Sequence, residues 1–293
     1  KSKQFNVFGI DSLNNYYNKK LKIKRLKILK RNKNFFFYKI NLIEKKKLIP
    51  LFKKNNFDII YHIAGQPGVL YSLKDPKSYV LNNAKATKII TQIAKKYYIK
   101  KFIFASSSSV YGDQKKFPIS ENFKKKPKNP YAKTKLESEK IVFKTFKNSK
   151  SKYIIFRFFT VYGPYGRPDM FIHKFLNSIK KNKKIKLYNN GANYRDFTYV
   201  DDVVKILSKS LKKIPQKKII NICRSNPIKT THLVNMIKKI YKKNFRINKI
   251  GFVNGEMLKT HGCNKLLKRN FTNTKFTDIK FGLKKTVLFF KKY

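Results

Sequence analysis

The sequence predicts an α/β protein built on a doubly wound parallel β-sheet, with a smaller, partly interleaved C-terminal lobe. Short continuous apolar runs, such as residues 58–64 and 101–106, alternate with longer helical segments. Strands have this composition when helices cover both faces of a parallel sheet. A length of 293 residues with 41% hydrophobic content provides enough material for one large core and a second lobe.

The expected elements follow one another in the alternating order of such a sheet. Strands are expected at residues 5–11, 35–41, 58–64, 101–106 and 153–159. Helices are expected up to about residue 29 and at residues 43–55, 76–98 and 131–146. After Gly163 the pattern loosens, and we expect helices at 171–181, 200–211 and 230–241 and a strand at 186–188. This predicts a first domain at residues 1–163 and a lobe at 164–293, with residues 195–222 returning to the sheet.

The net charge of +57 raises the possibility of a polyanion-binding protein. However, the lysines run through the whole chain, and Arg, the better reader of phosphate and guanine, is scarce. Lys, Asn, Ile and Phe are enriched together, as an A+T-rich coding sequence would produce. We therefore expect a solvated basic surface and no specific nucleic-acid partner, with a non-catalytic polyanion-binding protein as the alternative.

Several classes of protein are disfavoured. No run approaches 18 uncharged apolar residues, and the start of the chain lacks the apolar region of a signal peptide. Cys223 and Cys263 form no disulfide framework and have no companions at metal-ligand spacing, which favours a reducing cytoplasm. Asp201 and Asp202 precede two valines and are better placed to cap a helix than to bind a metal. We expect no membrane segment and no metal site.

The pair Tyr131/Lys135 is the first candidate for catalysis. Residues four apart share one helix face, where an ammonium can stabilise a phenolate and make tyrosine a usable base. The spacing alone is weak evidence, because the chain contains four such pairs: Tyr16/Lys20, Tyr97/Lys101, Tyr111/Lys115 and Tyr131/Lys135. A serine-rich strand end at residues 106–109, which could orient a substrate alcohol, distinguishes the last pair.

Asp11 ends an early strand, where a dinucleotide-binding α/β fold places the carboxylate that binds the adenosine ribose. The glycine-rich phosphate loop should lie about 20 residues before such an acid, and the sequence contains no Gly-x-Gly-x-x-Gly or Gly-x-x-Gly-x-x-Gly. We therefore expect the first strand and the glycine loop upstream of Lys1. The strands at residues 5–10 and 59–64 should then flank a vacant position, and the chain alone should be inactive.

Six blocks in this order resemble the extended short-chain dehydrogenases/reductases of the NAD-dependent epimerase/dehydratase family, most closely the UDP-glucuronate 4-epimerases. The blocks are residues 9–17, 62–72 and 106–112, the pair Tyr131/Lys135, and residues 157–170 and 195–202. The resemblance implies a Rossmann fold, an NAD cofactor, a UDP-sugar substrate and a homodimer, in an isomerase that serves polysaccharide biosynthesis. The last 60 or so residues match weakly.

The resemblance also implies the catalytic roles. Tyr131 takes the proton of the sugar 4-hydroxyl while NAD takes the C4 hydride, and Lys135 stabilises the phenolate and contacts the nicotinamide ribose. Ser107 matches the catalytic serine, although Ser108 and Ser109 are close enough that the choice stays open. The resulting 4-keto sugar turns over, and the hydride returns to its other face.

The binding residues follow in the same way. Those implied to hold NAD are Asp11 at the adenosine ribose, Asn41 and Leu42 at the adenine, and Ala64, Gly65 and Gln66 beneath the cofactor, together with Tyr131 and Lys135. Those implied to contact substrate are Asn83, Ser108, Ser109, Thr160 and Arg195. Arg167 could grip a uronate carboxylate or be a solvated loop charge. The expected reaction interconverts UDP-glucuronate and UDP-galacturonate; another sugar-nucleotide epimerase, dehydratase or decarboxylase is the alternative.

Overall fold

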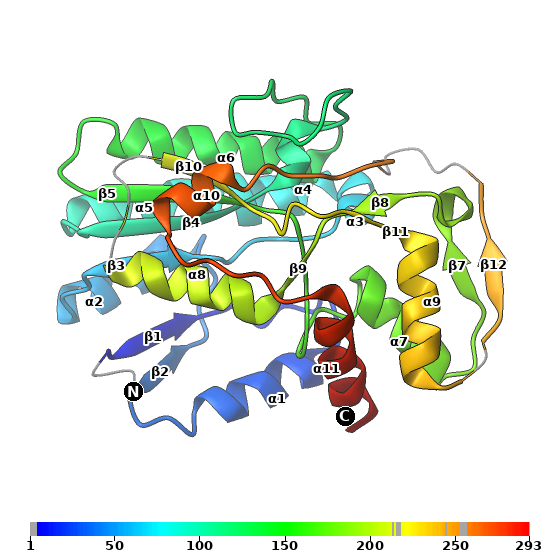
Figure 1. Ribbon diagram of the computed structural model, residues 1–293. Helices are drawn as coiled ribbons and strands as arrows, with labels where there is room; N and C mark the ends of the chain where they lie inside the picture. The colour runs from blue at the N-terminus through cyan, green and yellow to red at the C-terminus, as the bar shows by residue number, and fades with distance from the viewer. Residues whose placement is uncertain (1–4, 213, 215–217, 244, 252–256, 293) are drawn as a thin grey trace.

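Two parallel β-sheets form the centre of the molecule in the computed structural model, which describes residues 5–212, 214, 218–243, 245–251 and 257–292 (Figure 1). The larger sheet has four strands in the order β10 (Lys218–Ile222), β5 (Lys152–Phe158), β4 (Lys101–Ser107) and β3 (Ile59–His62). The smaller pairs β1 (Val7–Ile10) with β2 (Phe35–Tyr38). The outer ends of both predicted domains, residues 1–4 and 293, lie outside the described residues, as do 213, 215–217, 244 and 252–256 within the second.

No ladder joins the two sheets within the described residues. There β1 pairs only with β2, and β3 pairs only with β4. Figure 1 draws β1 and β2 as a separate layer below β3. The prediction that the strands at residues 5–10 and 59–64 do not pair directly is confirmed.

The larger sheet is buried on both faces, which explains the continuous apolar runs of its strands. In β4, Phe102 and Phe104 pack into one core while Ile103 packs into the other. The first core also contains side chains of α2 (Lys45–Lys54), α5 (Ala86–Lys96) and α6 (Pro130–Phe146). The second contains those of α8 (Val200–Lys212) and α10 (Lys265–Asn270). The doubly wound α/β fold predicted from the sequence is therefore confirmed.

The helix predicted at residues 76–98 has three parts. It begins as α4 (Pro76–Tyr79), continues as a π-helix, η1 (Val80–Lys85), and ends as α5. A preceding helix that was not predicted, α3 (Val69–Lys74), lies between β3 and α4. The remaining helix of this half, α1 (Lys19–Leu29), follows the loop after β1 and buries none of its residues fully.

The second lobe has its own core at one end of the molecule (Figure 1). Its helices are α7 (Phe171–Lys180), α9 (Thr230–Tyr241) and α11 (Ile279–Lys292). Its short strands pair as β6 (Thr160–Tyr162) with β9 (Phe197–Tyr199), β7 (Ile185–Leu187) with β12 (Ile247–Lys249), and β8 (Tyr194–Arg195) with β11 (Ile228–Lys229). Two short 3₁₀ helices, η2 (Ser108–Tyr111) and η3 (Tyr188–Gly191), complete the described elements. Within the described residues, no helix has the length and apolar character needed to cross a membrane.

Candidate active site

A cavity of about 850 Å³ opens where the carboxyl ends of β1, β3 and β4 face the loops that follow β5 and β6. This edge of a doubly wound sheet is where ligands bind in such folds. All predicted site residues except Asn83 line it: Asp11, Asn41, Leu42, Ala64, Gly65, Gln66, Ser107, Ser108, Ser109, Tyr131, Lys135, Thr160, Arg167 and Arg195. The structure thus brings together residues from seven separate stretches of sequence.

Tyr131 and Lys135 lie on the first turns of α6. The side chain of Asn129 caps this helix by accepting a hydrogen bond from the Ala132 backbone N–H at 2.9 Å, and Pro130 begins it. Tyr131 is half-buried and Lys135 is 6% exposed. Of the four Tyr-x-x-x-Lys pairs, all within the described residues, only this one has both members on the cavity wall.

The ammonium of Lys135 is fixed by contacts with β4. Its Nζ donates a hydrogen bond to the Ala105 carbonyl oxygen at 2.5 Å and lies 4.8 Å from the centre of the Phe104 ring. Burial lowers the pKa of Lys135 to about 8, although the negative charge of Glu139 partly opposes this shift. The side chain of Lys135 therefore loses its positive charge at a pH not far above neutral.

The serine-rich end of β4 supplies hydroxyl groups to the same wall. Ser107 and Ser109 are both 8% exposed and their hydroxyl oxygens are hydrogen-bonded to each other. The Ser109 backbone N–H also donates to Ser107 Oγ at 3.2 Å, which places the two hydroxyls at the start of η2. Ser108 lines the cavity beside them. The geometry leaves the choice among the three serines open.

Tyr111 is the other tyrosine that follows the serine-rich stretch closely and has a lysine four positions later. Its hydroxyl makes hydrogen bonds in the protein interior and does not line the cavity. It is fully buried, and its hydroxyl donates to Asn221 Oδ1 at 2.7 Å and accepts from Arg157 Nη1 at 3.0 Å. Arg157 in turn forms a buried ion pair with Glu139, with Nε–Oε1 and Nη2–Oε2 distances of 2.8 and 2.6 Å. Sequence analysis missed this network; the signal was Glu139, four residues after Lys135 on the same helix face.

The opposite wall presents a carboxylate and apolar side chains. Asp11 lies exposed at the end of β1, and its Oδ1 accepts a hydrogen bond from the Leu13 backbone N–H at 2.6 Å. Ile10, Ile40 and Leu42 line the cavity next to it. A carboxylate beside an apolar slot suits a ribose diol next to an aromatic base.

Asn83 lies behind the cavity and does not line it. It is 2% exposed; its Oδ1 accepts from the Gln66 backbone N–H at 2.7 Å. Its Nδ2 donates to the Gln66 carbonyl oxygen at 3.2 Å and to Thr134 Oγ1 at 3.1 Å. A Cβ at Gly65 would lie 2.7 Å from Asn83 Oδ1, so the missing side chain at this position permits the close approach. Asn83 therefore joins the loop after β3 to α6.

The loop between β6 and α7 brings Arg167 to the cavity. Burial lowers the pKa of the Arg167 guanidinium, but the hydrogen bond and charge of Asp169 outweigh this effect and raise it. Thr160 begins β6, and its backbone N–H donates to the Asp196 carbonyl oxygen at 3.1 Å. Arg195 in β8 donates from Nη1 to the Tyr194 carbonyl oxygen at 3.0 Å. Two arginines thus reach one cavity, Arg167 from the loop after β6 and Arg195 from β8.

Asp202, which sequence analysis assigned to a helix cap, lies in the first turn of α8. Its two carboxylate oxygens accept hydrogen bonds from the backbone N–H and the hydroxyl of Thr277 at 2.7 and 2.8 Å. Within the described part of the chain, no cluster of His, Cys, Asp and Glu is arranged to hold a metal.

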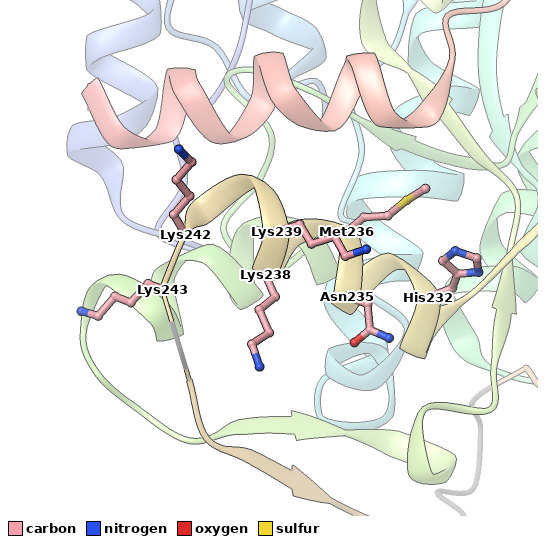
Figure 2. A pocket seen from close by; sticks show the side chains of 7 residues that line it. All are labelled: His232, Asn235, Met236, Lys238, Lys239, Lys242 and Lys243. Carbon is pink, nitrogen blue, oxygen red and sulfur yellow. The ribbon is translucent and has the colours of Figure 1, made fainter.

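A second cavity, of about 610 Å³, lies along α9 and contains none of the predicted site residues. Its lining residues are His232, Asn235, Met236, Lys238, Lys239, Lys242 and Lys243. Figure 2 shows the ammonium groups of Lys238 and Lys243 pointing away from each other. The polar groups of this surface do not converge on one point, in contrast to those around Tyr131.

Residues 1–223 match the NAD dependent epimerase/dehydratase family. The chain belongs to this family. The family relationship, the enzymatic nature and the NAD cofactor predicted from the sequence are thereby confirmed.

Individual relatives support the family assignment over most of the chain. An uncharacterised protein of Methanocaldococcus jannaschii is 40% identical over 87% of this chain and 78% of its own length. The UDP-glucuronate 4-epimerase of Thermodesulfobacterium geofontis is 33% identical over 96% of this chain and 87% of its own length. The crystal structure of UDP-glucuronic acid 4-epimerase from Bacillus cereus, in complex with UDP-glucuronic acid and NAD, superposes with a TM-score of 0.91 at 30% identity, covering 98% and 91% of the two chains.

The cavity residues of this epimerase/dehydratase family member fit NAD. Asp11 would offer a carboxylate to the adenosine ribose, Leu42 an apolar surface to the adenine, and Gly65 a position where no side chain obstructs the cofactor. Lys135 offers an ammonium at the point where the loop after β3 meets α6, since its Nζ lies 3.7 Å from the ideal Cβ position of Gly65. The donor set therefore agrees with the cofactor of the family.

Proposed function

We propose that the protein is a UDP-glucuronate 4-epimerase, which interconverts UDP-glucuronate and UDP-galacturonate. The observation that carries this proposal is the convergence of Tyr131, Lys135, three serines and Arg167 on one cavity. It occurs in a chain that is 33% identical to a UDP-glucuronate 4-epimerase across almost its whole length. A site of this composition can oxidise an alcohol next to a carboxylate.

The base of the reaction is the Tyr131 phenolate. Its position on the first turn of α6 lets it take the proton of the sugar 4-hydroxyl, with the nearby ammonium of Lys135 stabilising the negative charge. The hydroxyls of the Ser107–Ser109 stretch orient the same alcohol. When bound, NAD supplies the acceptor and donor of the C4 hydride. Tyr131 then returns the proton to the 4-oxygen.

Inversion requires that the planar 4-keto sugar turn over while its nucleotide stays bound. Arg195 at the edge of β8 is placed to hold the diphosphate through charge-assisted hydrogen bonds. The sugar end needs contacts that it can release and make again as it rotates. Holding one end and releasing the other allows the hydride to return to the opposite face.

A uronate creates a special problem, because oxidation at C4 produces a β-keto acid that loses CO₂ readily. Thr160 and Arg167 line the cavity on the side of the loop after β6. By holding the carboxylate near the plane of the sugar, these side chains would keep the breaking C–C bond from aligning with the carbonyl π system. The same contacts would select a uronate over a neutral hexose.

The proposal is tested by replacing Arg167 with alanine in the full-length gene product. Charge-assisted contacts contribute about 1.5–3 kcal/mol, so we expect kcat/KM for UDP-glucuronate to fall at least about tenfold. Chromatography of the products should also reveal UDP-pentose formed by decarboxylation. An exposed lysine far from the cavity, changed as Lys100→Ala, is the control. Equal turnover of UDP-glucose and UDP-glucuronate, unaffected by the Arg167 change, would leave only the broader function of a nucleotide-sugar epimerase.

We further propose a homodimer in the cytoplasm. The free thiols of Cys223 and Cys263 agree with a reducing compartment. Val80 and Phe143 are 53% and 51% exposed on the packed helical segments η1 and α6, which agrees with an apolar contact between two copies. The division into residues 1–163 and 164–293 is likewise a proposal; the pairing of β10 with β5 supports the return of the 195–222 segment to the sheet.

A further inference from the structure

The guanidinium of Arg167 is already bound by a carboxylate of its own loop. Arg167 Nε lies 3.0 Å from Asp169 Oδ1 and Nη2 lies 2.9 Å from Oδ2, which is a bidentate fork. Nη2 also approaches Met170 Sδ at 3.3 Å. This fork fixes the plane of the guanidinium and leaves the Nη1 edge for another acceptor.

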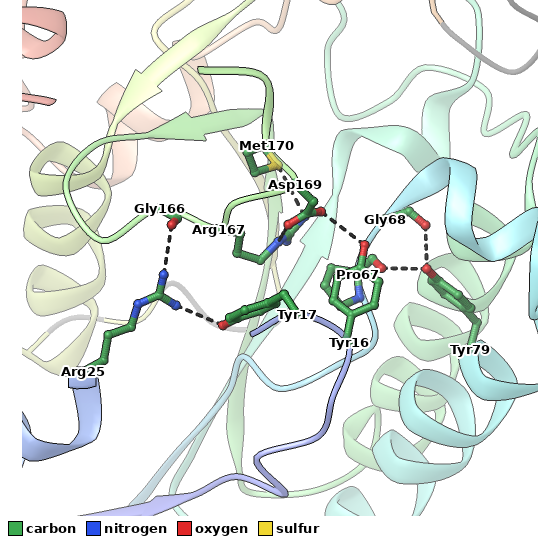
Figure 3. A network of polar contacts seen from close by, with 10 residues as sticks. All are labelled: Tyr16, Tyr17, Arg25, Pro67, Gly68, Tyr79, Gly166, Arg167, Asp169 and Met170. Carbon is green, nitrogen blue, oxygen red and sulfur yellow. Dashed lines mark hydrogen bonds and ion pairs between the residues drawn. The ribbon is translucent and has the colours of Figure 1, made fainter. Parts of the chain in front are cut away.

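The carboxylate of Asp169 is held in turn from the other side of the cavity. Tyr16, in the loop after β1, donates a hydrogen bond from its hydroxyl to Asp169 Oδ2 at 3.2 Å. Figure 3 shows the chain of contacts running from Tyr16 through Asp169 to Arg167. Burial and the charge of Asp169 raise the pKa of Tyr16 to about 12, so its hydroxyl remains a donor at neutral pH.

Tyr16 packs against the loop after β3 and the following helix α3. A Cβ at Gly68 would lie 2.1 Å from the Tyr16 hydroxyl oxygen, so only glycine lets the phenol sit there. The fully buried Tyr79 fixes the same turn, with its hydroxyl 2.6 Å from the carbonyl oxygens of both Pro67 and Gly68. The Tyr71 ring packs edge-on against Tyr16 at a centroid distance of 5.2 Å. The position of Tyr16 is therefore set by the loop after β3.

Besides the contact between Tyr16 and Asp169, a second set of hydrogen bonds joins the loop after β1 to the loop after β6. Arg25 of α1 donates from Nη2 to the Gly166 carbonyl oxygen and from Nη1 to the Tyr17 hydroxyl, both at 2.9 Å. Each loop also contains a residue in the left-handed region, Leu13 with φ 50° and Tyr165 with φ 56°. Such backbone strain persists only where the surrounding contacts determine the conformation.

We propose that Asp169 and Tyr16 are positioning residues that orient Arg167 for the carboxylate of the sugar and so determine the preference for a uronate. The inference rests on the proposed function and extends it to residues that do not themselves bind the substrate carboxylate. Asp169 neutralises the charge of Arg167, so attraction by charge alone is weak and recognition depends on the direction of the Nη1 edge. A neutral hexose at the same place has no carboxylate to meet that edge.

The test is the ratio of the dissociation constants of UDP-glucuronate and UDP-glucose, measured by calorimetry on the NAD-loaded full-length protein. We expect Asp169→Asn to weaken UDP-glucuronate binding about tenfold and Tyr16→Phe about threefold, in line with the loss of charge-assisted hydrogen bonds. UDP-glucose binding should not change. Because the two residues act in series, the double variant should bind UDP-glucuronate no more weakly than Asp169→Asn alone.

The controls make the same chemical changes outside the cavity: Tyr98→Phe, at a side chain that is 88% exposed, and Asp58→Asn, in a surface ion pair with Lys100. Equal weakening of both ligands would overturn the proposal, since that is what a merely structural role produces. Tighter binding of UDP-glucuronate by Asp169→Asn would also overturn it, because Asp169 would then compete with the substrate. A wild-type protein that fails to interconvert the two UDP-uronates refutes the proposed function instead, whatever the binding ratio.

Discussion

At the scale of single residues, the cavity distinguishes Tyr131 from the other tyrosines that have a lysine four positions later. Tyr131 and Lys135 both line it, whereas Tyr111 is fully buried and bonded to Asn221 and Arg157. The sequence alone offered four pairs of equal spacing, and only the neighbouring serines favoured Tyr131/Lys135, the pair that the structure places on the cavity wall. Spacing on a helix shows that two side chains share a face, but not what that face meets.

Tyr131→Phe should lower kcat by about 10²–10⁴-fold, the usual contribution of a positioned acid–base group. NAD binding, followed by fluorescence titration, should stay nearly unchanged because the phenol contributes proton transfer and little affinity. Tyr111→Phe is the matched comparison and should retain turnover, with a loss confined to stability. If Tyr111→Phe abolishes activity and Tyr131→Phe does not, the assignment of the base is wrong.

The pH profile should report Lys135. Burial lowers its pKa to about 8, so the ammonium that stabilises the phenolate is lost as the pH rises through this value. We expect kcat/KM, which reports the free enzyme, to fall about tenfold per pH unit above pH 8. Lys135→Arg keeps the positive charge and should move this decline to higher pH. A profile that stays flat up to pH 10 would contradict the role of Lys135.

Most of the predicted site residues line the cavity, but Tyr16 and Asp169, which also line it, were not predicted. Both lie inside blocks that resembled the family, yet their contact joins residues 153 positions apart. Such a contact depends on how two loops meet in the folded chain, and it produces no periodic pattern in the amino-acid sequence. For the same reason the occupied amide of Asn83, predicted at the substrate, could be located only in the folded chain.

At the scale of elements, the strands β1 to β5 and most helices were predictable, whereas most short strands of the second lobe were not. The strands β1 to β5 and the helices α2, α6 and α9 lie within or close to the ranges expected from apolar runs and helical periodicity. Of the two- and three-residue strands of the second lobe, β7 was predicted close to its observed position and the others were not, because so few residues do not show a period of two. The helix α11 was also not predicted, in the segment where the resemblance was weakest.

The π-helix η1 is the element that gives Asn83 its place. Single π-turns inside α-helices often occur at functional sites, and here the turn carries Asn83 to the loop after β3. Asn83→Ala leaves the buried backbone groups of Gln66 without their partner, which should cost about 1–3 kcal/mol of unfolding free energy. Urea unfolding would measure this loss, with the exposed Asn148→Ala as control. Equal stability of the two variants would show that the amide of Asn83 does not hold the loop.

At the scale of the whole molecule, the charge of +57 does not define a binding surface by itself. The lysines around the second cavity point in different directions (Figure 2), while the arginines Arg25, Arg157, Arg167 and Arg195 all make specific contacts. A dispersed basic surface attracts polyanions in a salt-dependent way and gives no specificity. The convergent site therefore favours the enzyme over the polyanion-binding alternative.

The glycine-rich phosphate loop expected upstream of Lys1 stays a prediction. The homodimer, the cytoplasmic location and the division into two domains also stay predictions.

The central claim is that the protein inverts C4 of a UDP-uronate by removing and returning the same hydride. The most direct measurement is to incubate the full-length protein and NAD with UDP-glucuronate deuterated at C4, and to analyse the products by NMR spectroscopy and mass spectrometry. We expect UDP-galacturonate that retains the deuterium at C4, with no net formation of NADH. No interconversion, or a product that has lost the deuterium to solvent, would contradict the claim.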